Sequence, residues 1–295
     1  MGCRLCIISG EAGEDVAQVI IGEAKKMFET VLFVPLRKIV VSCRGGKTIV
    51  SFHGKSLEEF DVVWARIFGD DFVLGETVLD ALENSGVYVQ GSAEAYQLCS
   101  HKFYTVKLAS KIGIPVPNSS LSVSPGVSLK MAKREGFPVV VKLLSGFGGK
   151  GVMLANSEQE FTPILDTMQV FNEFMTTQEF IRGGLDCRAL VIGVEVVGIR
   201  RTGAQGDWRA NVSGGGSAEF YELDENIKKI ALSAAALFGT DVCSVDFLIS
   251  KEGPKLVEIN FAPGMIQKFF GSTLAEKIIA YFHSKAIERK TAQGA

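Results

Sequence analysis

The sequence predicts a multidomain protein of α/β and α+β class, and three observations support this prediction. A chain of 295 residues can bury a large core and divide into two or three domains. Its first part alternates strand and amphipathic helix patterns, which is typical of a layered domain with a largely parallel sheet. Its last part contains antiparallel-type strands separated by helices. We therefore expect an N-terminal α/β domain (1–98), a connector helix with a small central domain (99–176), and a C-terminal domain (177–295).

Apolar runs and amphipathic stretches define the elements of the N-terminal domain. We expect strands at residues 3–9, 31–36, 61–68 and 87–91, helices at 14–29 and 74–86, and a hairpin over 38–53. The hairpin is expected to turn at Gly45-Gly46, because glycines adopt the positive φ that tight turns require.

Capping residues and glycines separate the remaining elements. Ser100 is expected to cap a helix over 101–112, which Gly113 ends. The central domain then contains a helix at 129–136, strands at 137–144 and 152–155, and a glycine-rich loop at 145–151 between these strands. The C-terminal domain contains strands at 178–181, 187–193, 195–203, 243–249 and 255–261, and helices at 225–239 and 273–289.

Composition argues against several classes of protein. Hydrophobic residues make up 47% of the chain and charged residues 22%, the balance of an ordinary soluble globular protein. A formal net charge of -2, with both signs interspersed, argues against nucleic acid or an anionic membrane as a partner. No apolar run approaches the ~18 residues that span a bilayer, and the N-terminus does not resemble a secretory signal. We expect a cytoplasmic protein with no membrane partner.

The six cysteines are scattered along the chain, at positions 3, 6, 43, 99, 187 and 243. Cys3 and Cys6 form a C-x-x-C pair, but they lie inside an expected strand, so their sulfurs would face opposite sides. Neither a second pair nor a histidine cluster accompanies them in the sequence. We expect buried free thiols rather than a zinc or redox site.

Two polar side chains interrupt an apolar strand near the C-terminus. In the stretch VEINFAPGM, residues 257–265, Glu258 and Asn260 alternate with apolar residues and so point to one face. Asp246 lies in the preceding strand and would face Glu258 if the connecting hairpin turned symmetrically about Glu252. Opposed like charges are destabilising, and a magnesium ion held by two carboxylates and an amide oxygen would compensate them. The alternative is a solvated strand face with three unrelated polar residues.

Two lysines and a glycine-rich loop form a candidate anion site. Lys142 lies in an apolar strand, where its ammonium must either reach water or meet an anion. The loop SGFGGKG follows at 145–151, and its glycines would let backbone N–H groups approach phosphate oxygens. Lys102, just after Ser100, is a second candidate cation. Each feature has an alternative interpretation: Lys142 could extend its side chain to solvent, Lys102 could be an ordinary exposed lysine, and the loop could be a glycine-rich hairpin turn.

Arginines gather in the C-terminal half of the chain. Their side chains hold phosphate and carboxylate groups through two parallel N–H donors. They occur beside Asp186 and around a loop that ends in three glycines, at Arg188, Arg200, Arg201 and Arg209, with Asn211 nearby. The alternative is a basic hairpin that solvates a sheet edge.

Together these motifs resemble the ATP-grasp superfamily and, within it, the RimK-type carboxylate–amine ligases, which add glutamate to an acceptor. The resemblance covers nearly the whole chain and rests on the order of its motifs rather than on any one of them. They are WARIF, SHK with LASKIGIPVP, FPVVVKLLSGFGGKGV, the stretch from TTQEFI to VSGGG, and SVDFLI with VEINFAPG. The resemblance implies an ATP-grasp fold with an N-terminal α/β domain, and ATP between the central and C-terminal domains.

The resemblance also implies roles for individual residues. The set around ATP would be Lys102 and Lys142 at the α- and β-phosphates, Gly148, Gly149 and Lys150 in the loop that closes over them, the backbone of Glu179 and Phe180 at the adenine, Asp186 near the ribose, and Arg209 and Asn211 at the γ-phosphate and the acceptor carboxylate. Asp246, Glu258 and Asn260 would bind two Mg²⁺ (or Mn²⁺) ions. The implied catalytic residues are Arg209, Asn211 and Lys142.

The reaction that the resemblance implies is ATP-dependent amide-bond formation. A carboxylate of the acceptor attacks the γ-phosphate to give an acyl phosphate and ADP, and the amine of L-glutamate then displaces phosphate. The metal ions, the lysines and Arg209 would neutralise charge on the transferring phosphoryl group. We expect ATP, L-glutamate and a carboxylate acceptor as partners, and a dimer or tetramer by analogy with the family.

The acceptor is the least defined part of this prediction. The lack of a strong charge bias favours a small coenzyme with a glutamyl tail, of the pterin or deazaflavin type, over a ribosomal or carrier protein tail. Ala262-Pro263-Gly264 departs from the serine–proline–glycine turn usual in the family, and this turn borders the ligand space. Arg66, near the end of an expected strand, is a candidate for binding an acceptor carboxylate, with a structural salt bridge as the alternative. A non-catalytic nucleotide-binding module and a phosphotransferase are the rival functions.

Overall fold

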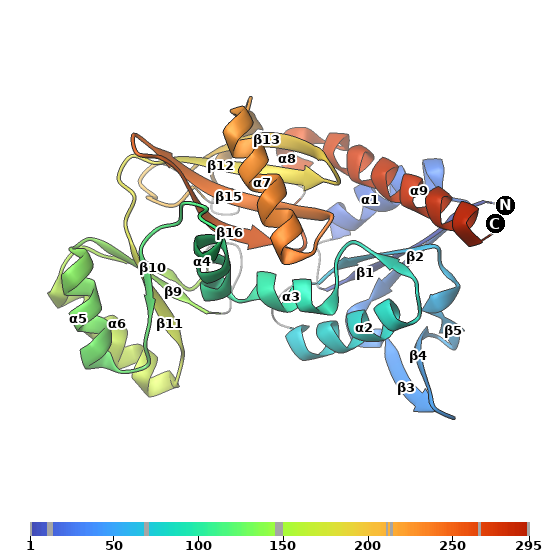
Figure 1. The fold of residues 1–295 in the computed structure, drawn as a ribbon, viewed down its shortest axis with the longest axis horizontal. Helices are drawn as coiled ribbons and strands as arrows, with labels where there is room; N and C mark the ends of the chain where they lie inside the picture. The colour runs from blue at the N-terminus through green and yellow to red at the C-terminus, as the bar shows by residue number, and fades with distance from the viewer. Residues whose placement is uncertain are drawn as a thin grey trace.

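The computed structural model describes residues 2–10, 14–67, 71–144, 150–210, 212, 215–264 and 267–293. Figure 1 shows a parallel sheet close to both chain termini, a larger antiparallel sheet beside it, and a small sheet with two helices at the far end of the molecule. The predicted combination of α/β and α+β units is confirmed.

The N-terminal sheet is parallel, and its central strands are deeply buried. Its strand order is β2 (Thr30–Pro35), β1 (Arg4–Ser9), β6 (Val62–Arg66) and β7 (Tyr88–Val89). Every residue of β6 is buried, as expected for an apolar strand in the middle of a parallel sheet. The helices α1 (Glu14–Met27) and α2 (Phe72–Asn84) connect its strands.

The predicted hairpin lies at the edge of this unit. It consists of β3 (Val40–Arg44) and β4 (Lys47–Phe52), followed by the short strand β5 (Lys55–Ser56) and flanked by 3₁₀ helices at Leu36–Lys38 and Leu57–Glu59. It turns at Gly45 and Gly46, whose φ angles are +57° and +75°. These angles are in the left-handed region that glycine adopts without strain, so the sequence signal and the turn agree.

The connector contains two helices rather than one. Ser92 caps α3 (Ala93–Ser100), and its hydroxyl accepts a hydrogen bond from Ala95 N at 2.9 Å. Ser100 therefore ends a helix, and the prediction that it caps the next one is wrong. His101 caps α4 (Lys102–Lys111) instead, because its Nδ1 accepts from Tyr104 N at 3.4 Å.

The small central unit has its own sheet and its own core. It contains β8 (Ser119–Leu121), α5 (Pro125–Glu135), β9 (Val139–Leu143), β10 (Val152–Ala155), α6 (Glu158–Phe171) and β11 (Met175–Glu179). The sheet order is β10-β9-β11-β8, with antiparallel pairs throughout. Both helices contribute to one cluster of buried side chains, which includes Ala132, Phe161 and Leu165. The helix α6 is absent from the predicted elements.

The limit of the central domain expected at residue 176 lies inside β11. All of β11 pairs with β9, and Glu179 N donates to the carbonyl oxygen of Asn118 at 2.9 Å, so the chain enters and leaves the small sheet at one place. The connector helix α4 packs against the large sheet instead, and its Ala109 belongs to a core shared with that sheet. We propose residues 118–179 as the small unit.

The C-terminal sheet is antiparallel and carries the candidate site. Its order is β14 (Ser217–Phe220), β13 (Glu195–Thr202), β12 (Leu185–Ile192), β15 (Val242–Ser250) and β16 (Gly253–Asn260). The helix α7 (Glu225–Phe238) covers one face. The short helix α8 (Gln267–Phe270) contacts β14, and the long helix α9 (Thr273–Gln293) covers part of the other face.

Two hydrophobic cores each join the N-terminal and C-terminal sheets. One contains Cys6 and Val63 together with Val191 and Val245. The other is built around α9 and contains Ile7 and Trp64 together with Leu190. The chain ends lie side by side (Figure 1), because Lys290 near the C-terminus donates to the carbonyl oxygen of Gly2. Lys290 also forms an ion pair with Asp61 at 3.3 Å. The two large sheets therefore share their interior, whereas the small unit does not.

All six cysteines are free. Five of them are buried, in agreement with the predicted buried thiols. Cys43 is exposed on β3, so the expectation is wrong for this residue, because the hairpin projects from the sheet and has solvent on this side. Within the part of the chain that the structure describes, no helix is both long and apolar enough to cross a membrane.

Candidate active site

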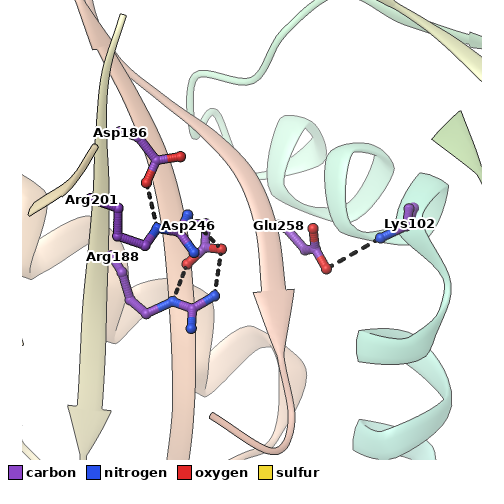
Figure 2. Close-up of polar contacts among 6 residues, drawn as sticks. All are labelled: Lys102, Asp186, Arg188, Arg201, Asp246 and Glu258. Atoms are coloured by element: carbon purple, nitrogen blue, oxygen red, sulfur yellow. Dashed lines mark hydrogen bonds and ion pairs between the residues drawn. The ribbon is translucent and has the colours of Figure 1, made fainter. Parts of the chain in front are cut away.

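One face of the C-terminal sheet changes from apolar to charged along its strands. Near α9 this face carries Leu190, Ile192, Ile199 and Val242, all of which are buried in the shared core. Farther along the same strands and on the same face, the side chains are Asp186 and Arg188 from β12, Arg201 from β13, Asp246 from β15, and Glu258 and Asn260 from β16. Strand alternation therefore gathers these polar side chains beyond the end of the core (Figure 2).

The predicted pairing of Asp246 with Glu258 is confirmed, but it arises differently from the expectation. The β15–β16 hairpin pairs Ser250 with Gly253, so its turn is one position out of the assumed symmetry about Glu252. A register shift of one residue between Asp246 and Phe247 brings the pairing beyond it back to the one that was assumed. A β-bulge of this kind changes the register of the strands beyond it, and here it places Asp246 and Glu258 at paired positions of the two strands.

Arginines already compensate the charge of Asp246. Arg188 donates from Nε and Nη2 to the two carboxylate oxygens, each at 2.8 Å, and Arg201 donates from Nη2 at 3.1 Å. Burial alone would raise the pKa of Asp246, but the two guanidinium groups outweigh burial and hold it well below its ordinary value. The opposed carboxylates therefore do not require a metal ion for charge balance, contrary to the reasoning from sequence.

Glu258 faces away from this cluster. Its carboxylate points toward α4, where Lys102 Nζ lies 3.3 Å from Oε1 (Figure 2). Asn260 stands opposite Ser244, and both the Asn260 Nδ2 and the Ser244 Oγ are buried without a hydrogen-bond partner among the described residues. Two polar groups at this end of β16 are therefore not satisfied by any residue in the described part of the chain.

The predicted ligand set fits a divalent cation in its chemistry. Glu258 and the Asn260 amide supply hard oxygen atoms, and Asp246 keeps lone-pair capacity beyond its three arginine hydrogen bonds. Across the described residues, no group of three or more His, Cys, Asp or Glu side chains is arranged as a metal site. The metal site of two carboxylates and one amide stays a prediction.

The two predicted lysines lie beside Glu258. Lys142 on β9 is 8% exposed, and its ammonium has no ion pair within the described part of the chain. Burial lowers its pKa to about 8, with Glu258 and Asp246 acting in the opposite direction and Lys102 in the same direction as burial. Lys102, Lys142, Asp246 and Glu258 therefore act on one another electrostatically, although they come from α4, β9, β15 and β16. A buried ammonium without a partner is poised to bind an anion.

The residues predicted at the adenine lie where β11 leaves the small sheet. The Glu179 N–H is donated to Asn118, so this donor is not available to a base, and the Glu179 carboxylate forms an ion pair with Lys255. Phe180 contacts the ring of Trp208, with centroids 6.0 Å apart. The part of the adenine prediction that rests on the Glu179 N–H is therefore not supported by this geometry.

The remaining predicted residues lie in different surroundings. Asp186 accepts from Arg201 Nε at 2.5 Å; burial raises the pKa of this carboxyl, and Arg201 opposes that shift. Arg209 is 38% exposed in its side chain and donates to Asp207 through Nη2 at 3.1 Å. Lys150 is exposed. Gly148, Gly149 and Asn211 lie outside the described residues.

Comparison with known proteins decides the family. Residues 99–282 match the RimK-like ATP-grasp domain. The chain belongs to this family. A Legionella pneumophila (strain Corby) protein named probable alpha-L-glutamate ligase is 37% identical over 239 residues, which cover 79% of each chain. The RimK-like protein described here is therefore an ATP-dependent ligase that forms C–N bonds.

Solved structures confirm the ATP-grasp fold of this RimK-like chain. A RiPP-associated ATP-grasp ligase of Chryseobacterium gregarium, in complex with ADP and a leader and core peptide, has a TM-score of 0.74 at 19% identity and covers 96% of this chain and 97% of its own. The D-alanine–D-alanine ligase from Bacillus anthracis complexed with ATP has a TM-score of 0.71 at 18% identity, with 99% of each chain covered.

Sequence reasoning missed the function of one arginine in this RimK-like site. Arg188 was recognised only as a member of a basic cluster, yet it makes the bidentate contact that orients Asp246. The available signal was the alternation in Asp186-Cys187-Arg188, which places an acid and a base on one strand face. The partner strand could not be identified without the order β13-β12-β15.

Titration of Lys142 is expected to make nucleotide binding by the RimK-like protein depend on pH. The pKa of about 8 lies below the ordinary value of 10.5, and an anionic phosphate would favour the ammonium form. ATP affinity should therefore fall as pH rises above about 8, by up to about tenfold per pH unit.

Between pH 8 and 10.5 the unfolded chain binds more protons than the nucleotide-free protein, so the free energy of unfolding should rise with pH in this window.

Fluorescence titration with a labelled ATP analogue from pH 7 to 9.5 measures this dependence. Lys142→Arg is the matched control, because a guanidinium stays charged throughout this range and should give a flat affinity profile. An affinity that falls equally in both proteins would show that a group other than Lys142 is responsible.

Proposed function

We propose that the protein is an ATP-dependent ligase that joins L-glutamate to a carboxylate of an acceptor through an acyl phosphate. One observation carries this proposal. The buried Lys142 ammonium, which has no ion pair with any described residue, lies with Lys102 close to Glu258 and Asp246 at the junction of the small and C-terminal sheets. Cations for phosphate oxygens and oxygen ligands for a metal ion are the two requirements of phosphoryl transfer. The name of the 37% identical Legionella protein supports glutamate as the amine substrate.

Each residue of this cluster has a distinct role in the proposed reaction. Lys142 and Lys102 bind phosphate oxygens of ATP and neutralise charge as the γ-phosphoryl group moves to the acceptor carboxylate. Asp246, Glu258 and Asn260 would hold a divalent cation, which would screen the negative charge of the phosphate groups during transfer. Arg188 fixes the Asp246 carboxylate, so that Asp246 cannot rotate away from this position.

The amine of glutamate then attacks the acyl phosphate, and phosphate leaves. Exclusion of water protects the acyl phosphate from hydrolysis during this step. We propose that Arg209 reaches the γ-phosphate after it exchanges its contact with Asp207 for the more highly charged ligand. The side chain of Arg209 is 38% exposed and that of Asp207 is 25% exposed, so water screens this ion pair and its exchange costs little free energy.

Two classes of acceptor are compatible with the site. A coenzyme with a glutamyl tail follows from the lack of charge bias in the sequence. A peptide or protein tail is favoured by a specific observation, since the fold neighbour from Chryseobacterium gregarium is in complex with a leader and core peptide. Both classes present a carboxylate to the same cluster, so the chemistry of the site is common to them.

Incubation with ATP, Mg²⁺, L-glutamate and a panel of acceptors tests the proposed function. The panel contains glutamyl coenzymes of the pterin and deazaflavin type and peptides that end in glutamate. Ligation should release ADP and increase the acceptor mass by one glutamyl unit per cycle. A stable phosphorylated product would identify a phosphotransferase, and nucleotide binding without ADP release across the panel would identify a non-catalytic module.

A further inference from the structure

A buried arginine at the carboxyl edge of the N-terminal sheet has no carboxylate partner among the residues that the structure describes. Arg66 is the last residue of β6 and is 3% exposed. Its Nη1 donates to the carbonyl oxygen of Pro263 at 3.3 Å, and its guanidinium lies 5.1 Å from the centre of the Trp64 ring. Its Nε has no hydrogen-bond partner among the described residues. The salt bridge considered from sequence is therefore not formed with any described residue.

A second buried donor stands next to Arg66. Ser9 pairs with Arg66 across the parallel strands β1 and β6, so both side chains point to the same face. Ser9 is 1% exposed, and its hydroxyl also lacks a partner in the described part of the protein. Leaving buried polar groups unsatisfied costs free energy, and two such groups side by side indicate a ligand that the protein alone does not supply.

The position of the pair agrees with a ligand site. Bound ligands in open α/β sheets gather beyond the carboxyl ends of the strands, and Ser9 and Arg66 are the last residues of β1 and β6. Burial lowers the pKa of Arg66 to about 10, because its surroundings penalise the charged form.

The pair is connected to the candidate active site through one turn. Pro263 belongs to Ala262-Pro263-Gly264, which directly follows the strand that carries Glu258. On the other side of this turn, a Cβ at Gly264 would lie 3.5 Å from Arg188 Nη1. Arg188 uses its Nε and Nη2 for Asp246, so Arg66 and Arg188 approach the turn from two different sheets.

We propose that Ser9 and Arg66 form a subsite for a second carboxylate of the acceptor, whose first carboxylate is activated beside Glu258. The guanidinium uses Nη1 for Pro263, so its Nε–Nη2 edge is the part that binds a carboxylate through two parallel N–H donors, and the Ser9 hydroxyl supplies a third. The acceptor would then end in a dicarboxylic unit. This assignment rests on the proposed function and adds the residues that would hold the second carboxylate of such a terminus.

Thermal unfolding without substrates separates this role from a structural one. If Arg66 stabilises the fold, its replacement should lower the melting temperature. If Arg66 binds a ligand, it is a buried charge that lacks its partner when no substrate is bound. Arg66→Met is then expected to leave the melting temperature unchanged or to raise it. Arg200→Met is the matched control, because Arg200 is exposed on β13 and pairs only loosely with Glu219 at 3.7 Å.

Binding of small probes to the full chain tests the ligand class. N-acetyl-L-glutamate and its two monoamides are titrated calorimetrically in the presence of Mg²⁺ and a non-hydrolysable ATP analogue. The wild-type protein should bind the diacid roughly tenfold or more tightly than at least one monoamide. Arg66→Met should abolish this difference, Ser9→Ala should reduce it roughly threefold, and neither should change the affinity for the nucleotide.

The assignment is overturned if Arg66→Met binds the diacid as tightly as the wild type, or if the wild type does not distinguish the diacid from either monoamide. It is also overturned if Arg66→Met melts several degrees lower while Ser9→Ala binds normally. Arg66→Lys serves if the methionine variant does not fold, since it keeps the charge but loses the paired donors. These measurements need no turnover, so they are independent of the ADP assay that tests the proposed function.

Discussion

Replacing Glu258 with glutamine is expected to reduce ADP formation by roughly 10³-fold or more at every Mg²⁺ concentration. Glutamine keeps the shape of the side chain and can still accept a hydrogen bond from Lys102, which lies 3.3 Å away, so the fold should be retained. It removes the negative charge that a divalent cation requires at this position. ADP release and Mn²⁺ binding, each measured across a range of metal concentrations, give the two readouts.

Glu252→Gln provides a matched control for this experiment. Glu252 lies in the turn of the same β15–β16 hairpin, but its side chain is 77% exposed, and Lys255, at 3.4 Å, is its one ion-pair partner among the described residues. Its replacement should leave turnover and metal binding unchanged. Near-normal turnover of the Glu258 variant would remove this residue from the metal site and, with it, the central assumption of the proposed mechanism.

Replacing Asp246 with asparagine should have the second large effect, this time on stability. Asp246 is 8% exposed and receives hydrogen bonds from both Arg188 and Arg201. The neutral amide leaves two buried guanidinium groups without their shared anion, and such a loss costs roughly 3–5 kcal/mol of the free energy of unfolding. Urea unfolding at neutral pH measures the change, and a decrease below about 1 kcal/mol would contradict the buried-pair interpretation.

The acid limb of the stability profile gives an independent check on Asp246. Its pKa is lowered from the ordinary value of 3.8 in the folded protein. The stabilisation by Asp246 is therefore complete above pH 3.8 and is lost as the pH falls through the folded pKa. The asparagine variant has no proton to gain, so the difference between the two proteins should shrink at low pH. Glu252→Gln, at an exposed pair with Lys255, should change neither profile appreciably.

The facing of Asp246 and Glu258 could be predicted from sequence because strand alternation and a short hairpin are local properties. The assumed symmetry is nevertheless wrong at the turn. Asp246 pairs with Glu258 only because a register shift of one residue follows Asp246. A bulge has no reliable signature in a single sequence, since it depends on how the strand bends against its neighbours.

The partners of these carboxylates could not be predicted in the same way. Arg188 and Arg201 reach Asp246 across β12 and β13, and Lys102 reaches Glu258 from a helix 156 residues earlier in the chain. Such contacts depend on strand order and domain packing, which local patterns do not encode. The missed capping role of Ser92 has a simpler cause, because Ser92 and Ser100 offer the same hydroxyl chemistry and only the helix between them decides which is used.

The shared interior of the two large sheets has a consequence for how substrates enter. The two large sheets cannot slide past one another without exposing the buried side chains that they share. The cluster around Phe161 contains side chains of the small unit alone. The cheapest large displacement is thus a rotation of residues 118–179 about the paired crossing at Asn118 and Glu179. Such a rotation would move Lys142 away from Glu258. Binding and release of the nucleotide would then depend on movement of the small unit relative to the two large sheets.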